Sequence, residues 1–194
     1  MLDTWFYNVD WDSIWVATEE TLYMTAISVA FTFILGIILG IILFLTGKGN
    51  IWENRVINQI IASIVNIFRS IPFIILIILL LPFTVLIMGT MLGANAALPA
   101  LIIGAAPFYA RMVEMALREI DKGVIEAAKS MGATNWQIIF KVLIPESLPA
   151  LISGITVTGI ALVGYTAMAG VIGAGGLGNL AYLQGFQSYN TQIM

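Results

Sequence analysis

The sequence predicts an all-α membrane protein, a polytopic bundle of helices that crosses the bilayer four times. Of its 194 residues, 60% are hydrophobic and only 10% are charged, whereas soluble domains are about 45–50% apolar and about 25% charged. A soluble core of this size cannot cover so much apolar surface. The chain has no cysteine and no histidine, which excludes disulfides, Cys/His metal sites and proton transfer by imidazole.

Long uncharged runs locate the membrane spans. About 20 apolar residues cross the hydrocarbon core, and helices satisfy their own backbone hydrogen bonds there. The runs are too long and alternate too little for strands of a membrane barrel. The longest apolar stretch is interrupted at Pro82, Gly89, Gly93 and Asn95. We therefore expect spans at about 21–45, 58–81, 97–117 and 147–170.

Charge distribution predicts the orientation of these spans. No basic residue precedes Lys48 or follows Lys141. Five acidic residues lie near the beginning of the chain, at Asp3, Asp10, Asp12, Glu19 and Glu20. Because loops rich in lysine and arginine stay in the cytoplasm, the loop that holds Lys48 and Arg55 should be cytoplasmic. Residues 118–146 (the charged loop) should be cytoplasmic too, with the N-terminus outside.

We expect one transmembrane domain over residues 1–194. Its first 20 residues contain three tryptophans, at Trp5, Trp11 and Trp15. Aromatic rings favour the headgroup level, so residues 1–20 should form an interfacial segment on the outer face. Residues 171–194 are glycine-rich and uncharged, and they should form a second outer segment.

Local signals in the charged loop predict a helix–turn–helix on the cytoplasmic face. Asp121 can cap the first helix, and Gly132 can end it in the left-handed conformation. Thr134 and Gln137 have the spacing of a capping box that starts the second helix. Pro145 should end that helix or begin the climb into the last span. That span should start at an N-cap serine, Ser147, with Pro149 in its first turn.

The triplet Glu126-Ala127-Ala128 gives this loop a candidate function. Two alanines beside one carboxylate make a low surface that can fit a groove on a partner. The alternative is a solvated connecting helix, with Glu126 paired to Lys129 for about 0.2–0.5 kcal/mol. The triplet alone is weak evidence. It is followed by Gly132 and then Pro145 before an outward-going span, and this combination favours docking.

This loop resembles the one by which permease subunits of ATP-binding-cassette importers dock on their ATPase, and the chain as a whole resembles the permease subunit of a bacterial methionine ABC importer. The similarity covers essentially the whole chain and includes Asn66-Ile67-Phe68-Arg69-Ser70-Ile71-Pro72-Phe73, Gly104-Ala105-Ala106-Pro107-Phe108, Ala110-Arg111-Met112-Val113-Glu114, Gly164-Tyr165-Thr166-Ala167-Met168-Ala169-Gly170 and Gly173-Ala174-Gly175-Gly176-Leu177-Gly178. Val142 and Ile144 depart conservatively from the usual loop pattern. Family members have five spans, so the resemblance implies that a fifth span is missing after Met194.

The resemblance also implies a function and its partners. It implies a pore subunit in a bacterial cell membrane that imports methionine, both stereoisomers and close analogues, without being an enzyme and without a cofactor. A second copy of the chain would complete the pore, a cytoplasmic ABC ATPase dimer would hydrolyse ATP, and an outer substrate-binding lipoprotein would deliver methionine. The sequence contains no GxxxxGK[ST] motif, consistent with a separate ATPase.

Three residues are candidates for the translocation path or its gate, namely Met168, Tyr165 and Arg69. Met168 has a soft thioether that suits a gate, and ordinary packing is its alternative. Arg69 lies in an apolar region, where a charge is often functional, or it extends to the headgroups instead.

Two glycine motifs each have two interpretations. Gly36 and Gly40 suit close helix packing, between two copies or within one, and we favour the second. The motif over 173–178 matches a dinucleotide fingerprint, but it lacks the preceding strand and the following acid, which favours a tight outer turn.

Other functions remain as alternatives. The chain can be an ABC permease for another amino acid or small solute. A self-powered carrier or channel is less favoured, because such carriers commonly hold carboxylates or histidines within their spans, and here only Glu114 lies near a span end. A structural or assembly role is the remaining alternative.

Overall fold

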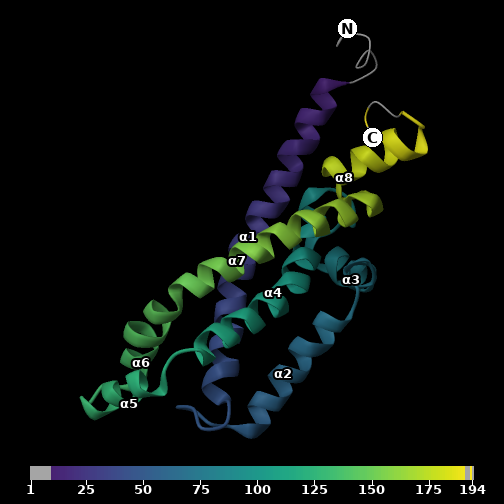
Figure 1. The fold of residues 1–194 in the computed structure, drawn as a ribbon. Helices are drawn as coiled ribbons and strands as arrows, with labels where there is room; N and C mark the ends of the chain where they lie inside the picture. Colours follow the sequence, from purple (N-terminus) through teal and green to yellow (C-terminus); the bar gives the residue numbers. More distant parts are fainter. Residues whose placement is uncertain (1–9, 191–192, 194) are drawn as a thin grey trace. The chain divides into compact units, whose positions relative to one another are not determined.

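The structure is a computed structural model that describes residues 10–190 and 193. Between residues 10 and 190 the regular secondary structure is entirely helical (Figure 1). The helices are α1 Trp11–Thr46, α2 Arg55–Ser70, α3 Phe73–Met88, α4 Ala94–Arg118, α5 Lys122–Ser130, α6 Asn135–Ile138, η1 Ile139–Leu143, α7 Ile144–Ala169, η2 Gly170–Ala174, α8 Gly176–Leu180 and η3 Ala181–Gln187. The three η elements are π-helical.

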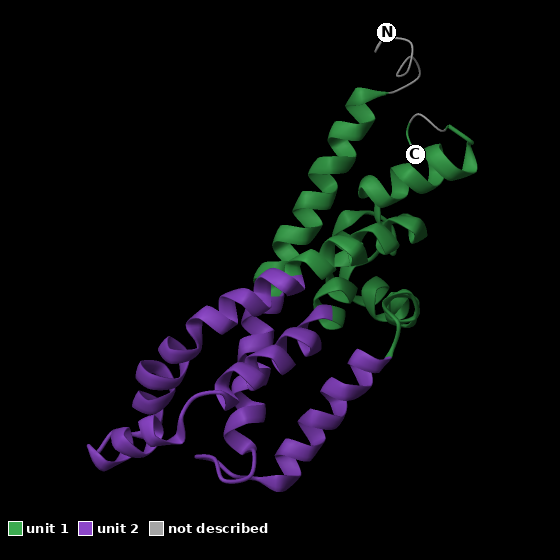
Figure 2. Ribbon diagram, in the orientation of Figure 1, with its two compact units in different colours: residues 1–31, 71–104, 159–194 green, residues 32–70, 105–158 purple. Residues whose placement is uncertain are grey.

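The chain divides into two compact units, drawn in green and purple in Figure 2. Unit 1 comprises residues 1–31, 71–104 and 159–194, and unit 2 comprises residues 32–70 and 105–158. The single-domain organisation expected from the sequence stays a prediction.

Three described stretches are long and apolar enough to cross a membrane, namely Trp11–Thr46, Ala94–Arg118 and Asn135–Ala174. A fourth span exists if α2 and α3 are counted together. This agrees with the predicted all-α membrane class and leaves the span count at three or four.

Helix α1 extends beyond the expected span at its N-terminal end. Asp10 caps it, because its Oδ1 accepts hydrogen bonds from the backbone N–H groups of Asp12 and Ser13. The Ser13 hydroxyl also donates to this carboxylate and lowers the pKa of Asp10. Trp11 and Trp15 belong to the same continuous helix as the expected span. Trp5 lies outside the described residues, and the interfacial location of this segment stays a prediction.

The two glycines of the GxxxG motif pack within one copy of the chain. A Cβ added to Gly36 would lie 2.5 Å from Cδ1 of Tyr109. One added to Gly40 would lie 2.6 Å from the Ala110 carbonyl oxygen. Hydrogen in place of a side chain therefore lets α1 approach α4 closely in unit 2. The favoured interpretation, packing within the monomer, is confirmed.

The expected span over 58–81 is instead two helices, α2 and α3, separated at residues 71–72. The break comes at Pro72, because a proline disfavours the helical conformation in the residue before it. Pro82, which we expected to interrupt the chain, lies inside α3. Helix α3 ends at Gly89, whose φ of 73° is left-handed and whose N–H donates to the Val85 carbonyl.

Helix α4 matches the expected span at 97–117 and carries a charged cluster at its C-terminal end. Glu114 is buried, with 3% of its side chain exposed. Its two oxygens accept from Arg111 Nη1 and Arg118 Nη2, both at 2.5 Å. These two ion pairs satisfy a buried carboxylate that would otherwise be costly.

The last expected span begins earlier than predicted. Ser147 is not an N-cap: it lies inside α7, is buried, and donates from Oγ to the Leu143 carbonyl at 2.8 Å. Helix α6 continues through η1 into α7 without intervening coil. In η1 the Ile144 N–H donates to the Ile139 carbonyl. This widened turn directly precedes Pro145, whose ring would collide with the carbonyl four residues back in a regular α-helix.

Candidate functional site

The first helix of the charged loop, α5, has the ends that the sequence predicts. The Asp121 carboxylate accepts a hydrogen bond from the Gly123 N–H at 2.7 Å, so it caps the helix. After Ser130 the chain turns through Gly132, whose φ is 80°. A side chain there would meet no atom within 4 Å, so the backbone conformation alone calls for glycine.

The second half of the turn is fixed by a capping box. Thr134 Oγ1 accepts from the Gln137 N–H at 3.4 Å, and Gln137 Oε1 accepts from the Thr134 N–H at 2.8 Å. Both bonds of the predicted motif are therefore present. Together with the cap at Asp121 they hold α5 and α6 on either side of a defined turn.

Ala128 does not belong to the exposed surface that the sequence predicts for the triplet. Glu126 and Ala127 are exposed, but Ala128 is buried with Ile138, Ile139 and Leu143 in the core of unit 2. The physical reason is the helical period of about 3.6 residues, which turns neighbouring side chains to different faces. Ala128 therefore anchors the loop to the core.

Several large apolar side chains of the loop remain exposed. Met131 is 82% exposed, Trp136 61% and Phe140 60%. The ring of Trp136 stacks on that of Phe140, with centroids 5.9 Å apart, and forms a T-shaped pair with Trp52, from the loop between α1 and α2, with centroids 5.4 Å apart. Sequence reasoning did not single out Met131, Trp136 or Phe140 as part of the site. The sequence does contain a signal for these three residues, because they are large apolar residues within the chain's most polar segment.

The alternative reading of the loop, with Glu126 paired to Lys129, is not observed. In the described part of the chain, the ion pairs are those of Glu114 with its two arginines. Glu126 and Lys129 instead line a small cavity of about 70 Å³, with Asn50 and Ile51 from the preceding loop. Both charges therefore stay available to solvent or to a partner.

The remaining predicted site residues fall in two places. Pro145 is exposed in the first turn of α7, in unit 2 with the charged loop. Arg69 also belongs to unit 2, exposed in the last turn of α2, where a cation suits the helix dipole. Tyr165 and Met168 belong to unit 1. The Tyr165 ring stacks on Phe73 at 4.3 Å, whereas Met168 is 44% exposed.

The glycine-rich segment packs tightly against neighbouring backbone. Gly93 N–H donates to the Gly173 carbonyl at 2.9 Å. A Cβ at Gly178 would collide with the backbone of Ala167. Gly173 and Gly175 have φ values of 98° and 83°. These features are those of a tight turn, as predicted, and no strand precedes it in the described part of the chain.

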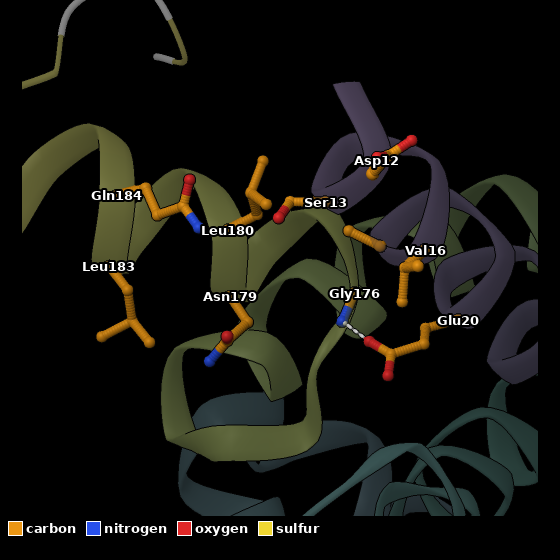
Figure 3. Close-up of a pocket in the computed structure, with 10 residues that line it drawn as sticks. Asp12, Ser13, Val16, Glu20, Gly176, Asn179, Leu180, Leu183 and Gln184 are labelled. Carbon is orange, nitrogen blue, oxygen red and sulfur yellow. Dashed lines mark hydrogen bonds between the residues drawn. The ribbon is translucent and has the colours of Figure 1, made fainter. Parts of the chain in front are cut away.

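A second cavity lies in unit 1 beside this turn. It has a volume of about 380 Å³ and is lined by the first turns of α1 and by α8 and η3 (Figure 3). Glu20 closes one side, because its carboxylate accepts from the Gly176 N–H at 2.6 Å. Thr21 Oγ1 accepts from the Leu177 N–H at 2.9 Å. These bonds tie the segment after α7 to α1.

Relatives of this chain are membrane transport proteins. It is 68% identical over 193 residues to the methionine import system permease protein MetP of Bacillus subtilis (strain 168), covering 100% of this chain and 87% of the relative. It is 53% identical over 151 residues to the D-methionine transport system permease protein MetI of Escherichia coli (strain K12), covering 78% and 70%.

Solved structures give the same result. A chain of the MetNI methionine ABC transporter, in an inward facing conformation, matches with a TM-score of 0.91 and 49% identity over 96% of this chain and 88% of that one. The family model for the binding-protein-dependent transport system inner membrane component matches residues 32–194. The chain therefore belongs to the family of inner membrane components of binding-protein-dependent transport systems.

Proposed function

We propose that this chain is the membrane-spanning subunit of an ATP-driven importer that carries methionine into the cytoplasm. The observation that carries the proposal is 68% identity over the whole chain to a methionine import permease. Two copies would enclose the path, a binding protein would deliver the substrate, and a separate ATPase would hydrolyse ATP. This subunit would then contribute no catalytic residue.

The charged loop would bind the ATPase. Its support is an exposed apolar group, Met131, Trp136 and Phe140, carried on a turn that a cap, a capping box and a buried anchor hold rigid. Large exposed apolar side chains of this kind mark protein contacts. Glu126 and Ala127 would border this surface.

Uptake by the reconstituted complex tests the proposal. The chain, its genomic-neighbour ATPase and its binding protein are placed in liposomes, and radiolabelled L-methionine is supplied outside. We expect methionine to accumulate inside the liposomes only when all three proteins are present. Accumulation should also require ATP on the side of the membrane that carries the ATPase. A matched control uses an ATPase unable to hydrolyse ATP.

Competition decides the cargo. Excess unlabelled D-methionine and L-methionine should both reduce uptake, whereas lysine and glutamate should not. Equal competition by unrelated amino acids would identify a general amino-acid permease instead. Uptake that continues without ATP would identify a self-powered carrier.

A further inference from the structure

Helix α2 has three distinct faces. Val65 is its buried residue, with 1% exposed. A second face is apolar and exposed, with Ile60, Ile64 and Ile67 exposed by 50–59%. A third face is polar and exposed. With about 3.6 residues per turn, it aligns one stripe of side chains, Arg55, Gln59, Ser63, Asn66 and Ser70 (the polar stripe).

The middle of the polar stripe has no hydrogen-bond partner within the described part of the chain. Gln59, Ser63 and Asn66 are all exposed, and their side chains make no hydrogen bond there. Ser70 donates only to the Asn66 carbonyl of its own helix. Three neighbouring polar groups therefore need partners that come from outside the described residues.

A bilayer allows few such partners. Unsatisfied amides and hydroxyls are costly in hydrocarbon, so polar residues of membrane helices face the bundle interior or a water-filled cavity. The isoleucine face of α2 can contact lipid at no such cost. Helix α2 is long and apolar enough to cross a membrane only when it is counted together with α3. In such a span its two exposed faces would have different surroundings although they belong to the same helix.

We propose that the polar stripe of α2 lines the water-filled path through which the solute passes. Beyond Arg55 at its beginning, the stripe consists of amide and hydroxyl groups, which both donate and accept hydrogen bonds and carry no charge. Such a wall can exchange partners with water and with a small zwitterion without holding either tightly. The inference rests on the proposed transport function for the identity of the solute.

Thiol accessibility tests the stripe directly, because the chain has no cysteine of its own. Single variants are made as neighbouring pairs, Ser63→Cys with Ile64→Cys and Asn66→Cys with Ile67→Cys. Each is assembled with the ATPase and the binding protein in inverted membrane vesicles and treated with a cationic, water-soluble thiosulfonate. The reagent attacks the thiolate, which forms in water and is suppressed in apolar surroundings.

We expect Ser63→Cys and Asn66→Cys to react at least about tenfold faster than their isoleucine-face neighbours, because each unit of raised thiol pKa removes a factor of ten in thiolate. Lys48→Cys, in the cytoplasmic loop, serves as the reactive standard. Equal rates within both pairs, or two unreactive polar-stripe thiols beside a reactive Lys48→Cys, would overturn the proposal. Cysteine is nearly isosteric with serine, so Ser63→Cys should assemble normally. If Asn66→Cys does not assemble, the comparison of Ser63→Cys with Ile64→Cys tests the proposal on its own.

Transport gives a second and separate measurement. Labelled Ser63→Cys should lose most uptake, whereas labelled Ile64→Cys should keep it. If the polar-stripe cysteines react faster than their neighbours but the complex does not take up methionine, methionine is not the solute, and the path-lining role of the polar stripe still stands. If the complex takes up methionine but the cysteines of each pair react at equal rates, the polar stripe does not line the path, and methionine still stands as the solute.

Discussion

At the scale of single residues, Gly132 has the strictest requirement in the charged loop. Its φ of 80° lies in the left-handed region, and no neighbouring atom limits a side chain there. Any effect of a substitution therefore comes from backbone strain, which is about 1–3 kcal/mol for an unfavourable residue in this region.

We predict that Gly132→Val weakens binding of the ATPase while Gly132→Asn largely preserves it. Valine is β-branched and disfavours this conformation, whereas asparagine adopts it more readily than other non-glycine residues. The ATPase retained on the purified permease is measured for both variants, together with methionine-stimulated ATP hydrolysis. Membrane insertion should be equal in the two. Equal retention with valine and asparagine would show that the turn does not position the docking surface.

Residues whose partners are close in sequence were predictable. Asp121, Thr134 and Gln137 find their partners within three residues, so spacing alone specifies the bonds. The burial of Ala128 was not predictable in this way. It depends on residues from α4, η1 and α7 that assemble only in the folded unit.

At the scale of elements, the packing of α1 on α4 depends on the absence of side chains at two positions. A Cβ at Gly40 would lie 2.6 Å from a backbone oxygen, that of Ala110. A backbone atom cannot move aside as the end of a flexible side chain can, so the two helices would have to separate.

We predict that Gly40→Ala destabilises the protein by about 1–3 kcal/mol, the usual cost of overpacking. Thermal unfolding in detergent measures the change. Gly164→Ala in α7 is the matched control, because an added Cβ there meets nothing within 4 Å. The oligomeric state of Gly40→Ala should stay unchanged. Dissociation into single copies without lower stability would place the GxxxG motif at a seam between copies.

The prolines show why some helix boundaries cannot be predicted from the sequence. Both Pro72 and Pro82 follow an isoleucine or leucine in an apolar run, yet the chain breaks at Pro72 and continues helically through Pro82. Membrane helices tolerate proline when neighbouring groups satisfy the freed carbonyl. That condition depends on tertiary surroundings. Pro145 is accommodated in the same manner, by the widened turn of η1 before it.

At the scale of the whole molecule, charge is distributed unevenly along the chain. All basic residues fall between Lys48 and Lys141. Of the described stretches long enough to cross a membrane, Trp11–Thr46 precedes this region, Ala94–Arg118 lies within it, and Asn135–Ala174 begins within it and extends beyond it. The composition made the membrane class predictable, whereas the orientation rests on charge alone.

We predict that Lys129→Cys reacts with an impermeant maleimide only after the cells are permeabilised, whereas Gln187→Cys reacts in intact cells. Both side chains are exposed in the structure, so membrane sidedness alone should separate them. The cysteine-free parent chain gives the background. Labelling of Lys129→Cys in intact cells would put the charged loop on the wrong side of the membrane for any cytoplasmic ATPase.

The uninterrupted course of the chain from α6 through η1 into α7 has a mechanical consequence. Within the described part of the chain no flexible joint separates Trp136 from α7, and the helical backbone between them is continuous. A displacement of an ATPase bound at Trp136 would therefore move the cytoplasmic end of α7 directly. Inserting a short flexible linker between these two elements would leave both proteins assembled but disconnect ATP hydrolysis from solute movement.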